Sequence, residues 1–358
     1  MVSGDGTIIE AAASRYGLIK KEAAELNLQK AEKKLSKSLN DPKAIKSVKD
    51  AKLVVEELDE RLMKLKKEGR NGRTPMVSRI EPEAVIQKLK KGRSFAASYK
   101  PSVLANEKRI IVAHSLHPSD EIQVVEGMIK VAEKVGENKI EEILLDGGYC
   151  NNTIIGLCID KDISLLCPPR DMSNKNLKKM PKDDFKYIEN KDVYLCPKGK
   201  ELKRFGNTID KGRPIIKYRT TECLKCPIKV SCTSSKKGRV IKRYESDEGK
   251  EALKIVMKNP RARKKFAKRQ SMVEPVFSIL RLKQNLNRFR RKGLSSVKVE
   301  FALHVLAYNI GRLVAQTIGS GNHFKGLIIF LVKYMKKTIS EVKSLVIFYK
   351  PANLWQFR

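Results

Sequence analysis

The chain has 358 residues, of which 75 are Lys or Arg and 40 are Asp or Glu, so its formal net charge is +35. This excess of positive charge favours a polyanionic partner, most simply nucleic acid, over a Lys-rich surface that serves only solubility. No apolar run reaches the ~20 residues that a membrane helix needs, and no secretory signal pattern opens the chain. Because the seven cysteines are also an odd number, we expect a protein of the reducing cytoplasm without a membrane span.

The N-terminal part of the chain is predicted to hold one short strand and a helical hairpin. Residues 5–9 are the only segment before the hairpin that could supply a strand. Residues 20–67 are charged and helical in pattern, with a break at residues 40–42. In the second helix apolar residues recur at three- and four-residue steps, at Val48, Ala51, Val55, Leu58, Leu62 and Leu65. This spacing predicts two helices packed through a narrow apolar seam, with a partner-binding arm as the alternative.

The next part of the chain alternates between strand and helix patterns. Strands are predicted at residues 99–105, 109–116, 143–146 and 163–167, and helices at residues 119–132 and 151–158. Together with the strand at residues 5–9, this order predicts a mixed α/β sheet.

The second half of the chain begins with a polar segment, residues 171–260, that carries four of the cysteines and interrupts the sheet pattern. A basic run at residues 261–269 precedes two predicted helices, at residues 271–289 and 295–316. The predicted parts of the chain are therefore residues 1–19, 20–72, 73–170, 171–260, 261–318 and a tail of unassigned role at residues 319–358.

Two acidic residues stand out by their position in predicted strands. Asp146 follows an apolar run at residues 143–145 and enters a Gly-Gly turn, which is how an open α/β sheet presents a side chain to a ligand. Asp5 lies at the start of the N-terminal strand. Carboxylate oxygens suit Mg²⁺ or Mn²⁺, and two such ions can drive phosphodiester chemistry.

A third acid, Glu274, lies in a predicted helix among apolar neighbours. Its spacing from Ser271 also fits a capping box, in which Glu274 would only cap the helix. A carboxylate beside a buried face otherwise needs a metal or a cationic partner, for which Arg269 and Arg281 are the nearest options.

Several segments of the chain resemble the catalytic segments of insertion-sequence DDE transposases. Residues 5–11 resemble the segment with the first catalytic aspartate, and residues 146–149 (Asp-Gly-Gly-Tyr) resemble the segment with the second. Residues 273–277 are similar to the segment with the catalytic glutamate, and the closing-helix motifs of the family are matched at residues 291–294 and 306–309. The resemblance implies a ribonuclease-H-like mixed sheet flanked by helices, with a helical-hairpin insertion and a cysteine-containing insertion.

The resemblance also implies a mechanism, in which Asp5, Asp146 and Glu274 hold two Mg²⁺ or Mn²⁺ ions. The ions would activate water to cut a strand at each element end, and then the freed 3′-hydroxyl to attack target DNA, within a homo-oligomer. Asp120 matches a further acid of the family, which we interpret as a helix cap.

The resemblance and the basic runs at residues 261–269 and 288–292 also imply contacts to DNA phosphates. Arg281 stands where the family has Lys, and Phe266 is the nearest aromatic residue to the family's Tyr. The residues expected to contact DNA are Arg269, Arg281, Lys283, Arg288 and Arg290.

Four cysteines form a separate constellation. Cys223 and Cys226 have the two-residue spacing of a metal knuckle, with Cys196 upstream and Cys232 downstream. Four thiolates can close a tetrahedral structural Zn²⁺ site. Reduced cysteines, or a redox-sensitive pair, are the alternative. The other three, Cys150, Cys158 and Cys167, lie in apolar contexts and are expected in the core.

The N-terminus departs from the family pattern. Only four residues precede Asp5, where the family has a DNA-binding region and an apolar strand. We therefore expect a transposase truncated at its N-terminus, with Asp5 weakly held and its activity impaired. A non-catalytic, transposase-derived DNA-binding protein is the alternative. A ribonuclease-H-type nuclease acting on RNA–DNA hybrids fits the fold but not the closing-helix motifs.

Overall fold

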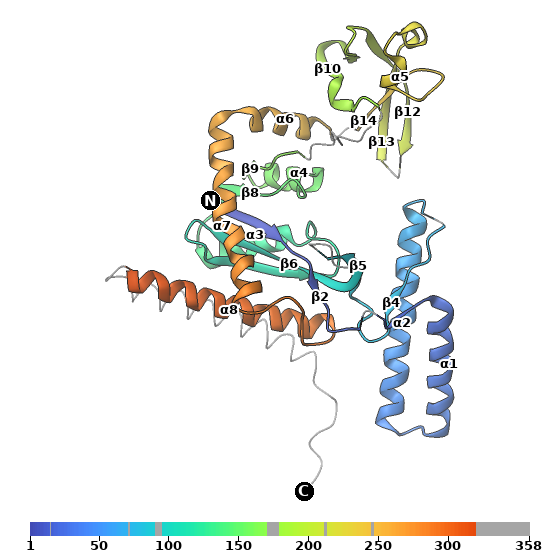
Figure 1. The fold of residues 1–358 in the computed structure, drawn as a ribbon, viewed down its shortest axis with the longest axis vertical. Helices are drawn as coiled ribbons and strands as arrows, with labels where there is room; N and C mark the ends of the chain where they lie inside the picture. The colour runs from blue at the N-terminus through green and yellow to red at the C-terminus, as the bar shows by residue number, and fades with distance from the viewer. Residues whose placement is uncertain are drawn as a thin grey trace.

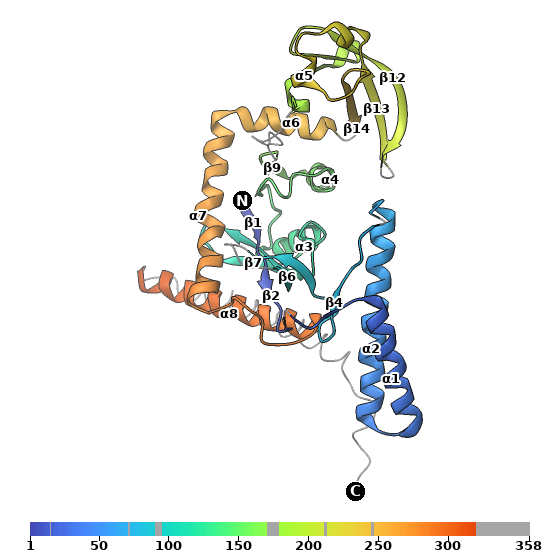
Figure 2. The same cartoon turned by 45° about the vertical axis from the view of Figure 1, so that its right-hand side comes forward.

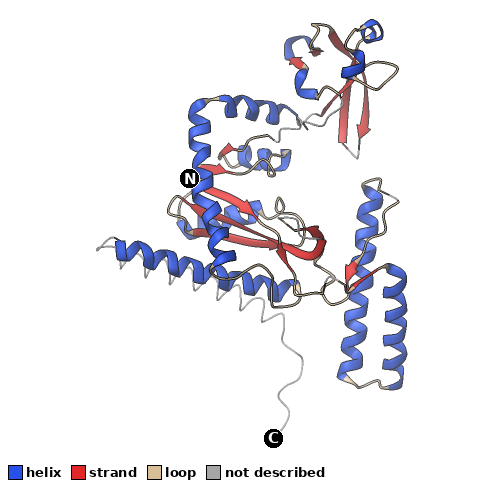
Figure 3. Cartoon of the chain, viewed as in Figure 1, coloured by secondary structure: helices blue, strands red, loops and turns tan. Residues whose placement is uncertain are grey.

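A central mixed sheet, a projecting helical hairpin and a small antiparallel sheet make up the chain (Figure 1, Figure 3). The computed structural model describes residues 1–14, 16–70, 72–89, 95–169, 179–210, 213–244 and 247–319. The start of the predicted polar segment and the predicted tail from residue 320 lie outside this part. Within it, no helix combines the length and apolar character needed to cross a membrane.

The helices are α1 (Lys21–Lys37), α2 (Pro42–Lys67), α3 (Val125–Gly136), α4 (Asn152–Asp160), α5 (Lys229–Cys232), α6 (Asp247–Lys258), α7 (Pro260–Leu282) and α8 (Leu294–Gly319). Short 3₁₀ turns lie at Lys182–Asp184, Glu189–Lys191 and Thr221–Lys225. The strands are β1 (Val2–Gly6), β2 (Ile9–Glu10), β3 (Leu18–Ile19), β4 (Val77–Ser78), β5 (Val85–Lys88), β6 (Phe95–Asn106), β7 (Ile111–His117), β8 (Glu142–Leu144), β9 (Ser164–Leu166), β10 (Lys186–Ile188), β11 (Val193–Leu195), β12 (Glu201–Asp210), β13 (Arg213–Arg219) and β14 (Val240–Tyr244).

Strand β1 lies at the centre of the main sheet. It pairs antiparallel with β6 along all five of its residues, from Val2 opposite Asn106 to Gly6 opposite Ser102. On its other edge it pairs parallel with β8, and β8 pairs parallel with β9. The prediction that Asp5 is weakly held was therefore wrong, because residues 2–6 suffice for a strand in which Asp5 pairs with Val103 of β6.

The other strands of this sheet extend it around β6. The second half of β6 also pairs with β7, and its first half pairs with β2 and β5. The strand path β7-β6-β1-β8-β9, antiparallel and then parallel, is compatible with the predicted ribonuclease-H-like fold. The strands predicted around residues 99–116 and 143–167 are confirmed, with bounds shifted by a few residues.

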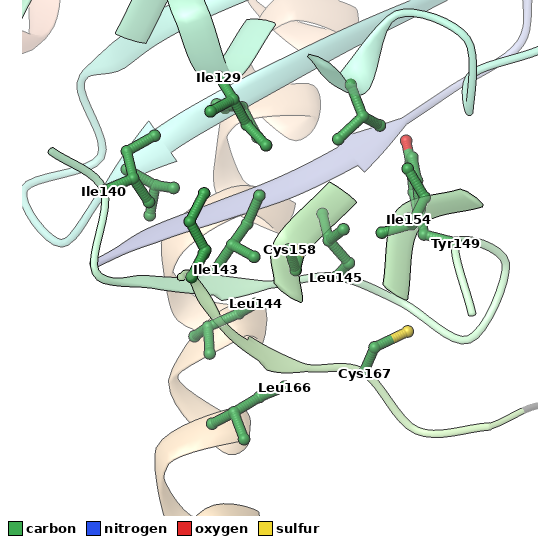
Figure 4. Packing of buried hydrophobic residues seen from close by; sticks show 14 of the residues in the cluster. Ile129, Ile140, Ile143, Leu144, Leu145, Tyr149, Ile154, Cys158, Leu166 and Cys167 are labelled. Atoms are coloured by element: carbon green, nitrogen blue, oxygen red, sulfur yellow. The ribbon is translucent and has the colours of Figure 1, made fainter. Parts of the chain in front are cut away.

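Helices cover the two faces of the sheet with separate apolar clusters. One cluster joins the sheet to α3 and α4 and includes Ile129, Ile143 and Ile154 (Figure 4). The other joins the sheet to α7 and α8 and includes Val276 and Phe301. Burial of such side chains stabilises the fold by about 25 cal/mol per Å² of apolar surface. Both faces of the strand that carries Asp5 are therefore supported.

The hairpin of α1 and α2 projects from the sheet (Figure 2). Its helices pack through Ala24, Val54 and Leu58, and Val77 of β4 closes the base of this cluster. Asp41 caps α2 by accepting a hydrogen bond from the Lys43 backbone N–H, and Pro42 occupies the first turn. These residues produce the break that the sequence predicted.

The polar segment contains a five-stranded antiparallel sheet, β10 to β14 in chain order, that the sequence pattern did not reveal. Its small core includes Tyr194, Leu202, Tyr218 and Ile241. Lys and Arg occupy many of the other strand positions, so the mean composition of the segment is polar although one face of the sheet is apolar.

Helix α7 begins earlier than predicted. Asn259 caps it by accepting a hydrogen bond from the Arg261 backbone N–H, with Pro260 at the first helical position. Ser271 lies inside the helix, where its hydroxyl donates to the Lys268 carbonyl at 2.9 Å. The capping-box interpretation of Glu274 was therefore wrong, because no helix begins at Ser271.

Helix α3 begins later than predicted, at Val125, because residues 119–124 form turns.

A buried carboxyl joins the hairpin base to the core and makes the stability of the fold depend on pH. Glu81 is fully buried; its Oε1 accepts from the Tyr99 hydroxyl at 3.3 Å and from the Gly293 N–H at 3.4 Å. Its Oε2 has no hydrogen-bond partner among the described residues. Burial raises the pKa of Glu81 above its ordinary value of 4.5.

We expect Glu81→Gln to stabilise the protein increasingly as the pH rises above 4.5. Above this value the unfolded state releases its proton first, so the wild type loses stability until the folded carboxyl also ionises. The gain should reach about 1–3 kcal/mol, the cost of a buried group without full hydrogen bonding. Urea unfolding at about pH 4.5 and about pH 8 measures it. Exposed Glu60→Gln is the control, and an equal gain at both pH values would contradict the assignment.

Candidate active site

The first two acids of the proposed trio leave the sheet side by side. In the parallel pair of β1 and β8, Ser3 lies opposite Leu144. Asp5 and Asp146 each lie two residues beyond this pair, so the close approach of β1 to β8 brings both acids to the same edge of the sheet. Gly4 permits this approach, since a Cβ at Gly4 would lie 2.5 Å from Leu145 Cδ2. Two carboxylates far apart in the sequence thus lie at the carboxyl ends of two neighbouring parallel strands.

The turn after β8 holds Asp146 in place. The Gly148 N–H donates to its Oδ1 at 2.6 Å, and the Tyr149 N–H donates to its backbone carbonyl at 3.0 Å. The same carbonyl accepts a hydrogen bond from the Cys167 thiol at 2.9 Å. The side chain is half-buried and is therefore accessible at the edge of the sheet.

Asp5 forms an ion pair with a residue of α7. Arg269 Nη2 lies 3.1 Å from Asp5 Oδ1, and the two side chains are 12% and 19% exposed. The Gly6 N–H also donates to Asp5 Oδ1, at 2.9 Å. Arg269 was predicted as a DNA contact and as a partner for Glu274, whereas the structure pairs it with the first aspartate.

Glu274 and Asp5 line the same cavity. This cavity has a volume of about 680 Å³ and also exposes Thr7, Ser278 and Asn287. Glu274 projects from the exposed side of α7, and no Lys or Arg of the described residues lies within ion-pair distance of it. The residues next to it, Val273 and Val276, are fully buried, so the backbone that carries Glu274 is fixed. Asp146 does not line this cavity.

Two of the predicted DNA-binding arginines are held by the protein itself. The Arg281 guanidinium donates to the Thr7 hydroxyl and to the Ile8 carbonyl at 2.8 Å, and so joins α7 to the chain after β1. Arg288 donates to the carbonyls of residues 11–13. These contacts assign both arginines a structural role that the sequence did not predict. Lys283 and Arg290 are exposed.

Beside Asp5, the structure places three polar residues that the sequence did not single out as part of a site. They are Ser102, Glu121 and Tyr149, whose side chains surround Gly6. Burial, and then the negative charges of Glu121, Asp5 and Asp146, raise the pKa of the Tyr149 hydroxyl. Tyr149 thus lies where the charges of three carboxylates meet. The only sequence signals were the aromatic residue of the Asp-Gly-Gly-Tyr motif and the acid that follows Asp120.

Asp120 itself has the local role that was predicted, although it caps a turn and not α3. Its Oδ1 accepts from the Ile122 N–H at 2.9 Å, and its Oδ2 accepts from Gln123 Nε2 at 3.1 Å. Both carboxylate oxygens are thus used within the loop before α3.

The acidic residues fit a divalent cation by the type of their donor atoms. Carboxylate oxygens are the ligands that Mg²⁺ and Mn²⁺ prefer, and the buried Tyr149 hydroxyl lies near them. In the part of the chain that the structure describes, no three His, Cys, Asp or Glu side chains are gathered closely enough to form a metal cluster. Asp5 is instead neutralised by Arg269, so a cation would have to compete with this guanidinium.

The cysteines do not support the predicted zinc site. Cys196 follows β11, Cys223 and Cys226 lie in and just after the 3₁₀ turn Thr221–Lys225, and Cys232 ends α5; no metal cluster is found among the described residues. The Cys196 thiol accepts a hydrogen bond from the Lys200 N–H at 3.3 Å. As predicted, Cys158 and Cys167 are buried in the core, whereas Cys150 is only half-buried.

Comparison with known protein families indicates which family this chain resembles, independently of the geometry of the site. Residues 195–314 match the family model described as a transposase DDE domain. The matched segment contains Glu274, α7 and most of α8, whereas Asp5 and Asp146 lie outside it. No curated protein and no solved structure matches the chain. The family match covers the helix that carries the proposed glutamate, and it supports a DDE transposase of an insertion sequence.

Proposed function

We propose that Asp5, Asp146 and Glu274 form the catalytic triad of a metal-dependent DNA transposase. One observation supports this proposal: Asp5 and Asp146 lie at the ends of paired parallel strands, and Glu274 lines the same cavity as Asp5. Carboxylates converging from a sheet edge and a helix are suited to Mg²⁺ or Mn²⁺. Two such cations would supply activation of the nucleophile and stabilisation of the leaving oxygen in phosphodiester cleavage and strand transfer.

The protein contributes a preorganised arrangement of these acids. Asp5 belongs to a strand paired on both edges, and the turn after β8 orients Asp146. Glu274 lies on a helix whose opposite side is buried in the core. Such rigid support keeps carboxylates in place without reorganisation when the substrate binds.

The basic surface would bind the DNA substrates. Lys283 and Arg290 are exposed, and the run at residues 261–269 supplies further cations on α7. Contacts of this kind neutralise phosphates irrespective of sequence, so affinity falls steeply as salt rises. The proposed partners are the element ends and target DNA, bound by a homo-oligomer.

Metal-dependent nicking of supercoiled plasmid DNA tests the proposed function. We expect the wild-type chain to nick DNA in Mg²⁺ or Mn²⁺ and to stop when the metal is chelated. Asp5→Asn should lower the nicking rate by about 10³-fold, since it removes a charged ligand. Nicking that persists in chelator, or an active Asp5→Asn variant, would contradict the triad.

A non-catalytic DNA-binding protein is the second candidate function. The ion pair between Arg269 and Asp5 favours it, because this pair neutralises the first aspartate. Under this function the wild type and Asp5→Asn would bind DNA equally, and neither would nick it in any metal. The binding and nicking assays, performed together, therefore separate the two functions.

A further inference from the structure

A second cavity, of about 460 Å³, lies beside β14, the edge strand of the sheet of β10 to β14. Its other walls include Asn152 at the start of α4, Lys182 of a 3₁₀ turn and Lys250 of α6. The sheet lies at the end of α6 that is far from α7 (Figure 1, Figure 2). The cavity is therefore formed by the sheet together with α4, which follows the turn of Asp146, and α6, which precedes the helix of Glu274.

Positive charge dominates the lining of this cavity. Its described lining residues include four cations and one acid, which are Lys182, Arg239, Lys242, Lys250 and Asp247. Asp247 is already engaged, since its Oδ2 lies 2.6 Å from Lys182 Nζ and accepts from the Tyr244 N–H at 3.0 Å. No acidic residue of the described part lies within ion-pair distance of Arg239 or Lys250. Cations gathered without matching acids favour an anionic ligand.

The cavity also offers hydrogen-bond donors of the kind that phosphate oxygens accept. Arg239 Nη1 donates to the Cys232 carbonyl at 3.1 Å, which orients the guanidinium. Its Nε is buried and has no hydrogen-bond partner in the described ranges of the chain. Asn152 is the first residue of α4, and the N-terminus of a helix carries partial positive charge. Guanidinium groups and helix N-termini both suit phosphate, so the lining fits a phosphate group.

The neighbouring strands continue the positive charge beyond the cavity. Lys217 of β13 lies directly opposite Lys242, and Lys203 of β12 lies directly opposite Arg219. Residues directly opposite each other, and residues two apart in one strand, project from the same face of a sheet, so these four cations share one face. Like charges at directly opposite positions destabilise a sheet. A bound polyanion would offset this repulsion across three strands, which a small anion in the cavity would not.

We propose that the cavity beside β14 is a phosphate-binding site for the DNA backbone, and that the cationic face of β12, β13 and β14 extends the path of this DNA. Arg239, Lys242 and Lys250 would contact the phosphate oxygens in the cavity. This surface is separate from the basic run on α7 and from Lys283 and Arg290. The proposal rests on the proposed function in one respect, because that function is the reason for assigning the phosphates to DNA.

The salt dependence of binding to a fluorescent duplex oligonucleotide, measured with the full chain in metal-free buffer, tests the proposal without relying on cleavage. Each phosphate contact adds about 0.9 to the slope of log K against log salt concentration. Lys250→Gln should therefore lower the magnitude of this slope by about 0.9 and weaken binding by about tenfold at fixed salt. The double variant with Lys242→Gln should lower it by about 1.8. Lys250→Arg keeps the charge and should keep the slope.

Lys258→Gln is the matched control for Lys250→Gln. Lys258 is exposed on the same helix and has no ion pair with any described residue, so the substitution removes the same charge away from the cavity. Its slope should equal that of the wild type. A wild-type slope in Lys250→Gln, or equal effects of the two substitutions, would overturn the site, because binding would then depend only on overall charge.

Calorimetric titration with inorganic pyrophosphate distinguishes DNA from a small phosphate compound. Pyrophosphate binding that is lost in Lys250→Gln, together with unchanged DNA binding, would overturn the assignment to DNA. The expected slopes in a chain that never nicks DNA would refute the proposed function and leave this DNA-binding site standing. Nicking that depends on the triad, with a wild-type slope in Lys250→Gln, would have the opposite meaning.

Discussion

Asp146→Asn is expected to lower the rate of metal-dependent strand cleavage by about 10³-fold or more while leaving DNA affinity nearly unchanged. Asparagine can still accept the hydrogen bond of the Gly148 N–H, so the turn after β8 should persist. What is lost is the negative charge beside Asp5. A 10³-fold loss corresponds to about 4 kcal/mol of transition-state stabilisation. Plasmid nicking and a gel-shift assay at fixed salt measure the two effects separately.

Glu274→Gln should have an effect of the same size, because Glu274 and Asp5 line one cavity. Asp160→Asn is a suitable control, since Asp160 is exposed at the end of α4 and its loss changes the net charge equally. If Asp146→Asn, Glu274→Gln and Asp160→Asn cut DNA at similar rates, cleavage would depend on overall charge and the triad would be refuted. A loss of DNA affinity that parallels the loss of cleavage would also contradict a purely catalytic role.

Gly4→Ala is expected to reduce both the stability of the protein and its cleavage rate. Its Cβ would lie 2.5 Å from Leu145 Cδ2 and 2.9 Å from Leu104 Cδ2, in a part of the core where both leucines are fully buried. Overpacking of this kind costs about 1–3 kcal/mol. Relief of the clash requires the Leu145 and Leu104 side chains or β1 itself to shift, and a shift of β1 would move Asp5. Urea unfolding measures the loss of stability, and nicking measures the loss of alignment.

Gly311→Ala provides the matched control for this substitution. Gly311 lies within α8, and a Cβ there would meet nothing within 4 Å. The same Gly→Ala change should therefore stabilise the protein by about 0.5–1 kcal/mol, because it reduces the entropy of the unfolded chain. Equal stabilities for the two variants would show that β1 and β8 are not tightly packed.

The local patterns predicted the elements whose residues repeat regularly. The strands around Asp146 were found because continuous apolar runs end in turn residues. The hairpin was found because its charged helices break at Pro42. By contrast, the sheet of β10 to β14 escaped prediction, since its segment is polar on average and its apolar core is small. The start of α7 was misplaced because Ser271 offered a capping pattern that Asn259 fulfils instead.

The roles of the basic residues also could not be predicted from local sequence patterns. Composition correctly identified a strongly basic chain and could not say which cations remain available to a ligand. Arg281 and Arg288 donate to groups near the N-terminus, which lie far from them in the sequence. Arg269 is paired with Asp5 and not with Glu274 on its own helix. Such pairings depend on which elements pack together, and no local pattern records them.

The sequence by itself indicated the resemblance to DDE transposases, the acid at the end of an apolar strand and the helical context of Glu274. These features depend on neighbouring residues, whose spacing is visible in one dimension. Only the tertiary structure decided that the five residues of β1 form a central strand, that β1 and β8 carry Asp5 and Asp146 to one edge of the sheet, and that Arg269 pairs with Asp5. The physical reason is that strand register and side-chain packing join segments far apart in the chain, and their geometry is set when the core forms.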